Sequence, residues 1–135
     1  MFEQTKSKPP KEFISEDDIE RLMLTLRGER VLLSQQLATL YHMKVKAFNQ
    51  TVKRNPRFFP DGSFFQLTME EFRDIFLQID TTSLQGSGRF LPYAFTFDAI
   101  IPLQYLMKRH GTDELNYTIF RAFLNKKRRL EALLG

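Results

Sequence analysis

The stretch KVKAFNQTVKRNPRFFP places the strongest constraint on how this chain folds. Val45, Phe48 and Val52 recur at helical spacing and fall within roughly 60° of one another on a helical wheel. Pro56 disfavours the helical conformation in the residue before it, so we expect a helix over roughly residues 44–55. The apolar side of this helix must be buried, and that requirement fixes which residues point outward.

The opposite side of this helix carries Lys46, Ala47, Gln50, Lys53 and Arg54, and no acid. Solvated helix faces usually mix charges of both signs, so an acid-free face is typical of a surface that meets a polyanion. Glutamine can bond adenine at two positions, alanine leaves room for a thymine methyl group, and lysine or arginine reaches guanine or phosphate. An ordinary solvated face is the alternative, and the residues alone leave both possibilities open.

A short helix is expected just before the basic one. Leu33, Leu37 and Leu40 repeat at helical spacing, Ser34 is a suitable N-cap, and the helix should end near Tyr41. Two consecutive helices joined by a short turn predict a helix-turn-helix pair, whose second helix enters the major groove of DNA.

A β-hairpin is expected just after the basic helix. Phe58-Phe59 and residues 64–67 flank Asp61-Gly62, a dipeptide typical of a hairpin turn. The hairpin would occupy the position of a wing, and Arg57 at its base would then face the phosphates.

The remaining patterns complete an α+β fold. Residues 22–33 read as two short strands around a Gly28 turn, which predicts an N-terminal β-hairpin. Residues 1–14 bury nothing and are expected to form a flexible N-terminal tail. Residues 15–135 are then a single domain, in which Ser15 and the acids after it start a helix.

The C-terminal half is expected to be mostly helical. Thr68 and Glu71 form a capping box for one helix, and Thr96 caps another that runs to about residue 109. A last helix is expected to start near Asp113 and to continue towards the end of the given sequence. The C-terminal helices are expected to pack behind the helix-turn-helix and its wing.

Composition excludes several classes of site. There is no Cys, and His42 and His110 lie far apart, so neither a disulfide framework nor a metal site is expected. The chain has no phosphate-cradling glycine loop and no catalytic arrangement of side chains, so we expect neither a cofactor nor an enzyme. The chain has no run of about 18 apolar residues, so no membrane span is expected. A cytoplasmic protein is the default expectation.

Several ordered blocks match a known pattern: LRGERVLLSQQLATLY, VKAFNQTVKRNPRFFPDGSFFQLTMEEF and GRFLPYAFT. Together they resemble the phage "ORF-six N-terminal" domain family, which is associated with the KilA N-terminal domain and with phage antirepressors. The resemblance covers roughly residues 19–128 and places Lys53, Arg54 and Asn55 where the family has Lys-Arg-Asn. It implies a DNA-binding domain carried by phages, prophages and related mobile elements, and hence a protein found with the nucleoid of a bacterial host.

The function expected from these observations is sequence-specific binding of double-stranded DNA, in the transcriptional control of a mobile element. The residues expected at base edges are Lys46, Gln50 and Arg54, and those expected at phosphates are Lys44, Lys53 and Arg57. The alternative is an antirepressor that binds a repressor protein and makes little contact with DNA.

Two features of the last helix bear on partners. A homodimer is expected, because two half-sites multiply affinity, and Leu130, Leu133 and Leu134 are the expected surface. The KKRR run at residues 126–129 is either a second phosphate contact or a favourable interaction with the helix dipole.

Overall fold

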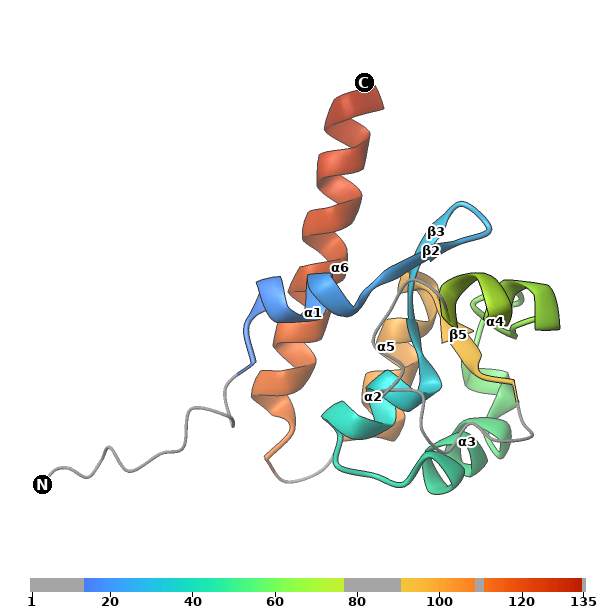
Figure 1. Cartoon of the computed structure of the whole chain (residues 1–135). Helices are drawn as coiled ribbons and strands as arrows, with labels where there is room; N and C mark the ends of the chain where they lie inside the picture. The colour runs from blue at the N-terminus through green and yellow to red at the C-terminus, as the bar shows by residue number, and fades with distance from the viewer. Residues whose placement is uncertain (1–13, 77–90, 109–110, 135) are drawn as a thin grey trace, which may run out of the picture.

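The computed structural model describes residues 14–76, 91–108 and 111–134 of the 135-residue chain. The elements are α1 (Glu16–Leu22), β2 (Leu24–Leu26), β3 (Glu29–Leu33), α2 (Ser34–Leu40), α3 (Val45–Lys53), the 3₁₀ turn η2 (Pro56–Phe58), β4 (Phe64–Gln66), α4 (Met69–Phe76), β5 (Tyr93–Phe95), α5 (Phe97–Leu106) and α6 (Asp113–Leu134) (Figure 1). The predicted α+β class is confirmed. So are the N-terminal hairpin and the two consecutive helices before Pro56.

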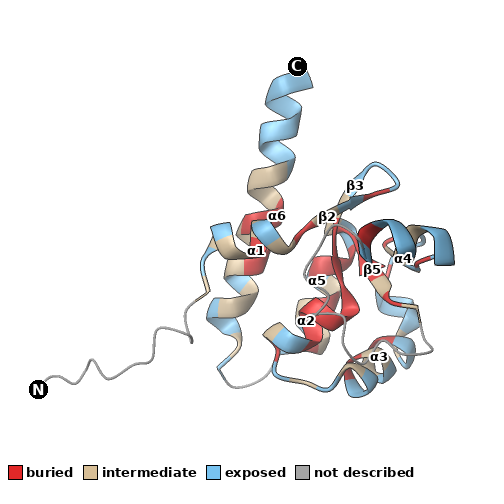
Figure 2. Ribbon diagram, in the orientation of Figure 1, coloured by how far each residue is buried: buried red, intermediate tan, exposed pale blue. Residues whose placement is uncertain are grey.

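The strands form one antiparallel sheet in the order β2-β3-β5-β4. Successive side chains in a strand point to opposite faces. Leu32 and Phe95 therefore join the larger core with α1, α2, α3, α5 and α6, whereas Val31, Leu33 and Ala94 form a smaller core with residues of α4. Both faces of the sheet are covered, and Figure 2 shows buried residues on the strands and on the sides of the helices around them.

The β2–β3 hairpin closes with a two-residue turn in which Arg27 and Gly28 have φ of 54° and 80°. Glycine adopts this left-handed conformation freely, but arginine does so only at some cost. Arg27 is held there by two hydrogen bonds that its guanidinium donates to the Glu71 carboxylate, at 2.8 and 3.0 Å. Its guanidinium also lies 3.9 Å from the centre of the Phe65 ring. These contacts fasten the hairpin tip to the first turn of α4.

The predicted β-wing is wrong. Pro56 starts a 3₁₀ turn, so Phe58 lies in η2 and not in a strand. Phe59, just after η2, is buried, and its ring centroid lies 5.1 Å from that of Phe64. The turn at residues 60–63 exists, since the Ser63 N–H donates to the Pro60 carbonyl at 3.0 Å. The strand that follows pairs with β5 instead of with the segment before the turn.

Two predicted caps are confirmed, and one is corrected. Ser15 and Thr68 each accept a hydrogen bond from the amide three residues later, as a capping box requires. Helix α2 begins at Ser34 itself, so Leu33 occupies the cap position. The Ser34 hydroxyl instead accepts a hydrogen bond from the Tyr93 N–H at 3.1 Å, which ties α2 to β5.

Thr96 does occupy the N-cap position of α5, but its hydroxyl donates to the Ser63 carbonyl at 2.9 Å. Helix α5 ends at Leu106, a few residues before the predicted end near 109. Residue 109 itself lies outside the described residues, as do residues 1–13 of the predicted tail.

Helix α1 packs along α6, and charged side chains line the contact. Glu20 accepts a hydrogen bond from Arg129 at 2.6 Å and lies 3.9 Å from the ammonium of Lys126. Two of the four bases in the 126–129 run are therefore paired with α1. The run also precedes the last turn of α6, which ends at Leu134, so interaction with the C-terminal dipole does not account for it. Beyond the run, Leu130, Leu133 and Leu134 are exposed.

Membrane-spanning helices and metal-binding clusters are both absent from the described residues. None of their helices is long and apolar enough to cross a membrane. No group of three acidic or histidine side chains among them could hold a metal ion.

The Arg27–Glu71 pair predicts a pH-dependent stability. The hydrogen bonds from Arg27, followed by the Thr68 amide, lower the pKa of the Glu71 carboxyl from 4.5 to about 2. A lowered folded-state pKa means that this stabilisation is complete above pH 4.5 and is lost as the pH falls towards 2. We therefore expect Glu71→Gln to lower the free energy of unfolding at pH 7, and we expect the deficit to shrink between pH 4.5 and 2.

Denaturant unfolding at a series of pH values measures this difference. The matched control is Glu70→Gln, which removes the neighbouring exposed carboxylate. A Glu71→Gln deficit that stays constant down to pH 2 would show that the ion pair does not stabilise the hairpin tip.

Candidate nucleic-acid interface

Helix α3 is attached to the core by one apolar side. Phe48 and Val52 are buried, and Val45 packs against the same core from a half-buried position. The Phe48 ring stacks on Tyr41 with a centroid distance of 6.5 Å and meets the edge of Phe95 at 5.6 Å. The wheel analysis of this side is confirmed.

The outward side of α3 is also as predicted. Its members are all exposed: Lys46, Ala47, Gln50, Lys53 and Arg54. Lys44, which precedes the helix, and Arg57, in η2, are exposed as well. The segment from residue 44 to residue 57 contains no acid, and among the described residues none of its five bases forms a salt bridge. Their positive charge is therefore available to an external ligand.

Lys53 is directed towards the sheet. Its ammonium lies 5.1 Å from the centre of the Tyr93 ring in β5. A cation over an aromatic face is attracted by the ring quadrupole and keeps its remaining donors free. This contact restricts Lys53 at the border between α3 and the sheet.

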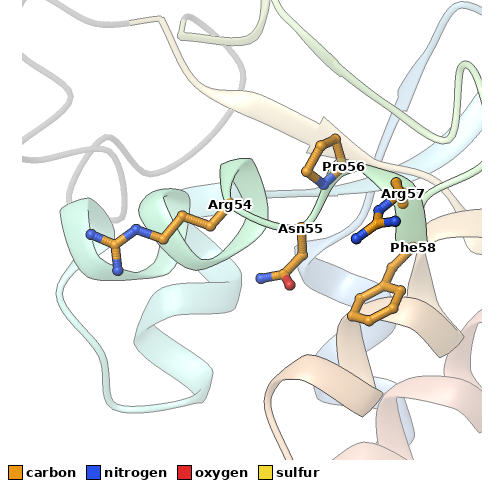
Figure 3. Close-up of a pocket in the computed structure, with 5 residues that line it drawn as sticks. All are labelled: Arg54, Asn55, Pro56, Arg57 and Phe58. Atoms are coloured by element: carbon orange, nitrogen blue, oxygen red, sulfur yellow. The ribbon is translucent and has the colours of Figure 1, made fainter.

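A shallow, open hollow follows the end of α3. It is lined by Arg54, Asn55, Pro56, Arg57 and Phe58. Figure 3 shows Arg57 and Phe58 side by side, while the Arg54 side chain extends in the opposite direction, towards α3. The Asn55 amide donates to the Thr51 carbonyl at 2.7 Å, so this side chain closes the helix end.

Arg57 does not lie at the base of a wing. It belongs to η2, where Pro56 supplies the first residue of the turn. The residue is nevertheless exposed and lies at the same end of α3 as Arg54, since both line the hollow. The structure therefore brings the six predicted contact residues onto α3 and the residues that flank it.

An exposed aromatic pair that was not predicted lies next to this surface. Phe58 contacts Tyr105 of α5 edge-on, with ring centroids 5.5 Å apart. The sequence patterns predicted a strand for Phe58 and gave no role to Tyr105. The available signal was the position of Tyr105 relative to Ile100 and Leu103, which are both buried.

Comparison with known proteins gives a family. A model described as the ORF6N domain matches residues 21–100, which is more than half of the chain. The chain belongs to the ORF6N domain family. No curated protein and no solved structure gave a significant match. The ORF6N match includes the sheet, α2, α3 and the six predicted contact residues, and it ends within α5.

The attachment of α3 through Phe48 predicts a large effect on stability. Phe48→Ala leaves a cavity between Tyr41 and Phe95, and we expect the free energy of unfolding to fall by about 3–5 kcal/mol. Gln50 lies two residues after Phe48 but on the exposed side of α3. Gln50→Ala should therefore change the free energy of unfolding by less than about 0.5 kcal/mol. Chemical denaturation of both variants tests this difference, and equal effects would contradict the orientation of α3.

Proposed function

We propose that this ORF6N-family protein binds double-stranded DNA with sequence specificity through the outward side of α3. The family suggests a phage-associated regulatory function. Within that range, we favour a transcriptional regulator or antirepressor of a phage or related mobile element. One observation carries the proposal: α3 presents an exposed, acid-free side whose bases form no salt bridge among the described residues.

The contact residues divide into two roles. Lys46, Gln50 and Arg54 are proposed to approach base edges in the major groove, where glutamine pairs with adenine and lysine or arginine with guanine. Lys44, Lys53 and Arg57 are proposed to hold phosphates, which fix the orientation of the protein but carry no sequence information. The contact of Lys53 with Tyr93 supports its role, because it restrains the ammonium at the edge of the α3 surface.

The proposal concerns binding alone. It requires no cofactor and no catalytic step, and the DNA target places the protein with the nucleoid in the cytoplasm of a bacterial host. A homodimer remains part of the proposal, because two linked half-sites raise both affinity and specificity.

An antirepressor that binds a repressor protein is the competing function. The cationic side of α3 would then meet an acidic protein surface. The two functions differ in a simple observable, because a phosphate-binding surface binds any duplex at low salt and loses affinity steeply as salt rises.

The first prediction concerns phosphate contacts. Each contact contributes about 0.9 to the slope of log K against log salt, so Lys53/Arg57→Ala should reduce the magnitude of this slope by about 2. The control Arg21/Arg73→Ala removes the same charge from exposed positions on α1 and α4 and should leave the slope nearly unchanged. Fluorescence anisotropy of a labelled random duplex over a salt series measures both. Absence of native binding at about 50 mM salt would reject DNA binding through α3.

The second prediction concerns base readout. On an operator obtained by selection from a random duplex library, Gln50→Ala should reduce discrimination at one base pair by about 1–3 kcal/mol. Lys44→Ala should instead weaken binding to all sequences nearly equally, because a phosphate contact is independent of sequence. Competition binding against singly substituted operators separates the two outcomes. Unchanged discrimination by Gln50→Ala at every position would remove Gln50 from the base-reading residues.

A further inference from the structure

Helix α5 is apolar on nearly every side. Ala99, Ile100 and Leu103 are buried in the core, yet Ile101 and Tyr105 on the other side are 62% and 69% exposed. A helix that is apolar all round is normally buried all round. The outward side of α5 therefore lacks a cover within the part of the chain that the structure describes.

Phe58 of η2 enlarges this apolar area. Its ring is 46% exposed and meets the edge of the Tyr105 ring at a centroid distance of 5.5 Å. Ile101 lies one helical turn before Tyr105 and on the same side of α5. We call Phe58, Ile101 and Tyr105 the α5 patch. Contiguous exposed apolar groups that include aromatic residues are typical of protein interfaces.

A charged residue lies at each end of the patch. Asp98 is exposed in the first turn of α5, and Lys108 is exposed just after the helix ends. The spacing 98, 101 and 105 places these three positions within roughly 60° on a helical wheel, and Lys108 follows the last turn of the helix. The outward side of α5 thus runs from an acid, through two large apolar residues, to a base.

This order is complementary to itself. If two α5 helices pack antiparallel about a two-fold axis, Ile101 of each copy faces Tyr105 of the other. The same axis places Asp98 of each copy opposite Lys108 of the other. A two-fold interface requires such a pattern, because residue i must match residue j while j matches i. We propose that two copies of this chain associate through the α5 patch.

Other occupants fit less well. Duplex DNA presents mainly charged phosphates at its surface, which offer little apolar area to Ile101 and Tyr105. The leucines at the end of α6 are also exposed, but two of the four bases in the KKRR run beside them already pair with Glu20, and the described helix after the run holds a single acid, Glu131. The α5 patch provides the apolar surface, and the flanking residues Asp98 and Lys108 provide the opposite charges.

Sedimentation velocity without DNA tests the association directly, at protein concentrations between about 1 μM and 1 mM. The native chain should form dimers, and Tyr105→Ser should raise the dissociation constant about tenfold or more. Tyr117→Ser is the matched control, because Tyr117 is 61% exposed on α6 and lies outside the patch. Circular dichroism melting should show that both variants remain folded.

A charge exchange identifies the pairing. In a dimer of the Asp98→Lys variant, the new lysine of each copy faces Lys108 of the other copy. In a dimer of the Lys108→Asp variant, the new aspartate of each copy faces Asp98 of the other copy. Each variant alone should therefore dimerise more weakly. In a mixture of the two variants both contacts become attractive, and a heterodimer should form in preference to either homodimer. A merely structural effect of either substitution could not be rescued by mixing.

Three results would overturn the proposal. One is a chain that stays monomeric over the whole concentration range. Another is a dimer that Tyr105→Ser leaves intact but Leu133→Ser dissociates, which would assign the interface to α6. The third is a mixture of charge variants with no preference for the heterodimer. Since these measurements contain no DNA, their outcome is independent of the proposed function of α3.

Discussion

The contact between Phe48 and Phe95 determines where the basic surface lies. Phe95 belongs to β5, which pairs with β3 on one side and β4 on the other, so its position is fixed by two neighbouring strands. Phe48 meets this ring from the middle of α3 and is fully buried. Because α3 is held against the central part of a sheet, its outward side chains start from a rigid base, as precise recognition requires.

The charges of the molecule are used in two different ways. Near α1, α6 and the hairpin tip, bases are paired with acids: Arg121 with Glu16, Arg129 with Glu20, and Arg27 with Glu71. These pairs link elements that are distant in the sequence. The bases of α3 and its flanks have no such partner among the described residues. The net charge of the chain is only +4, but the unpaired positive charge is distributed unevenly and gathers on α3 and its flanks.

Local patterns predicted the elements well, because their causes are local. Serine and threonine caps, the helical spacing of Val45, Phe48 and Val52, and the effect of Pro56 all act over a few residues. The wing failed for the opposite reason: Asp61-Gly62 correctly predicted a turn, but the partner of β4 lies near residue 94, about thirty residues later. The Ser34 hydroxyl likewise bonds Tyr93, and two bases of the KKRR run pair with Glu20. No local pattern reveals partners that lie so far away in the sequence.

The packing of α1 on α6 has a consequence for the order in which the domain forms. Glu16 binds Arg121 and Asn125, which lie 105 and 109 residues further along the chain. Contacts of such long range form slowly, because the intervening chain must first be brought together. During synthesis α1 emerges long before α6, so the ion pairs and packing between the two helices cannot form until α6 leaves the ribosome. The contact between α1 and α6 is thus among the last to form in this domain, and Ile19 stays uncovered by α6 until that helix has been made.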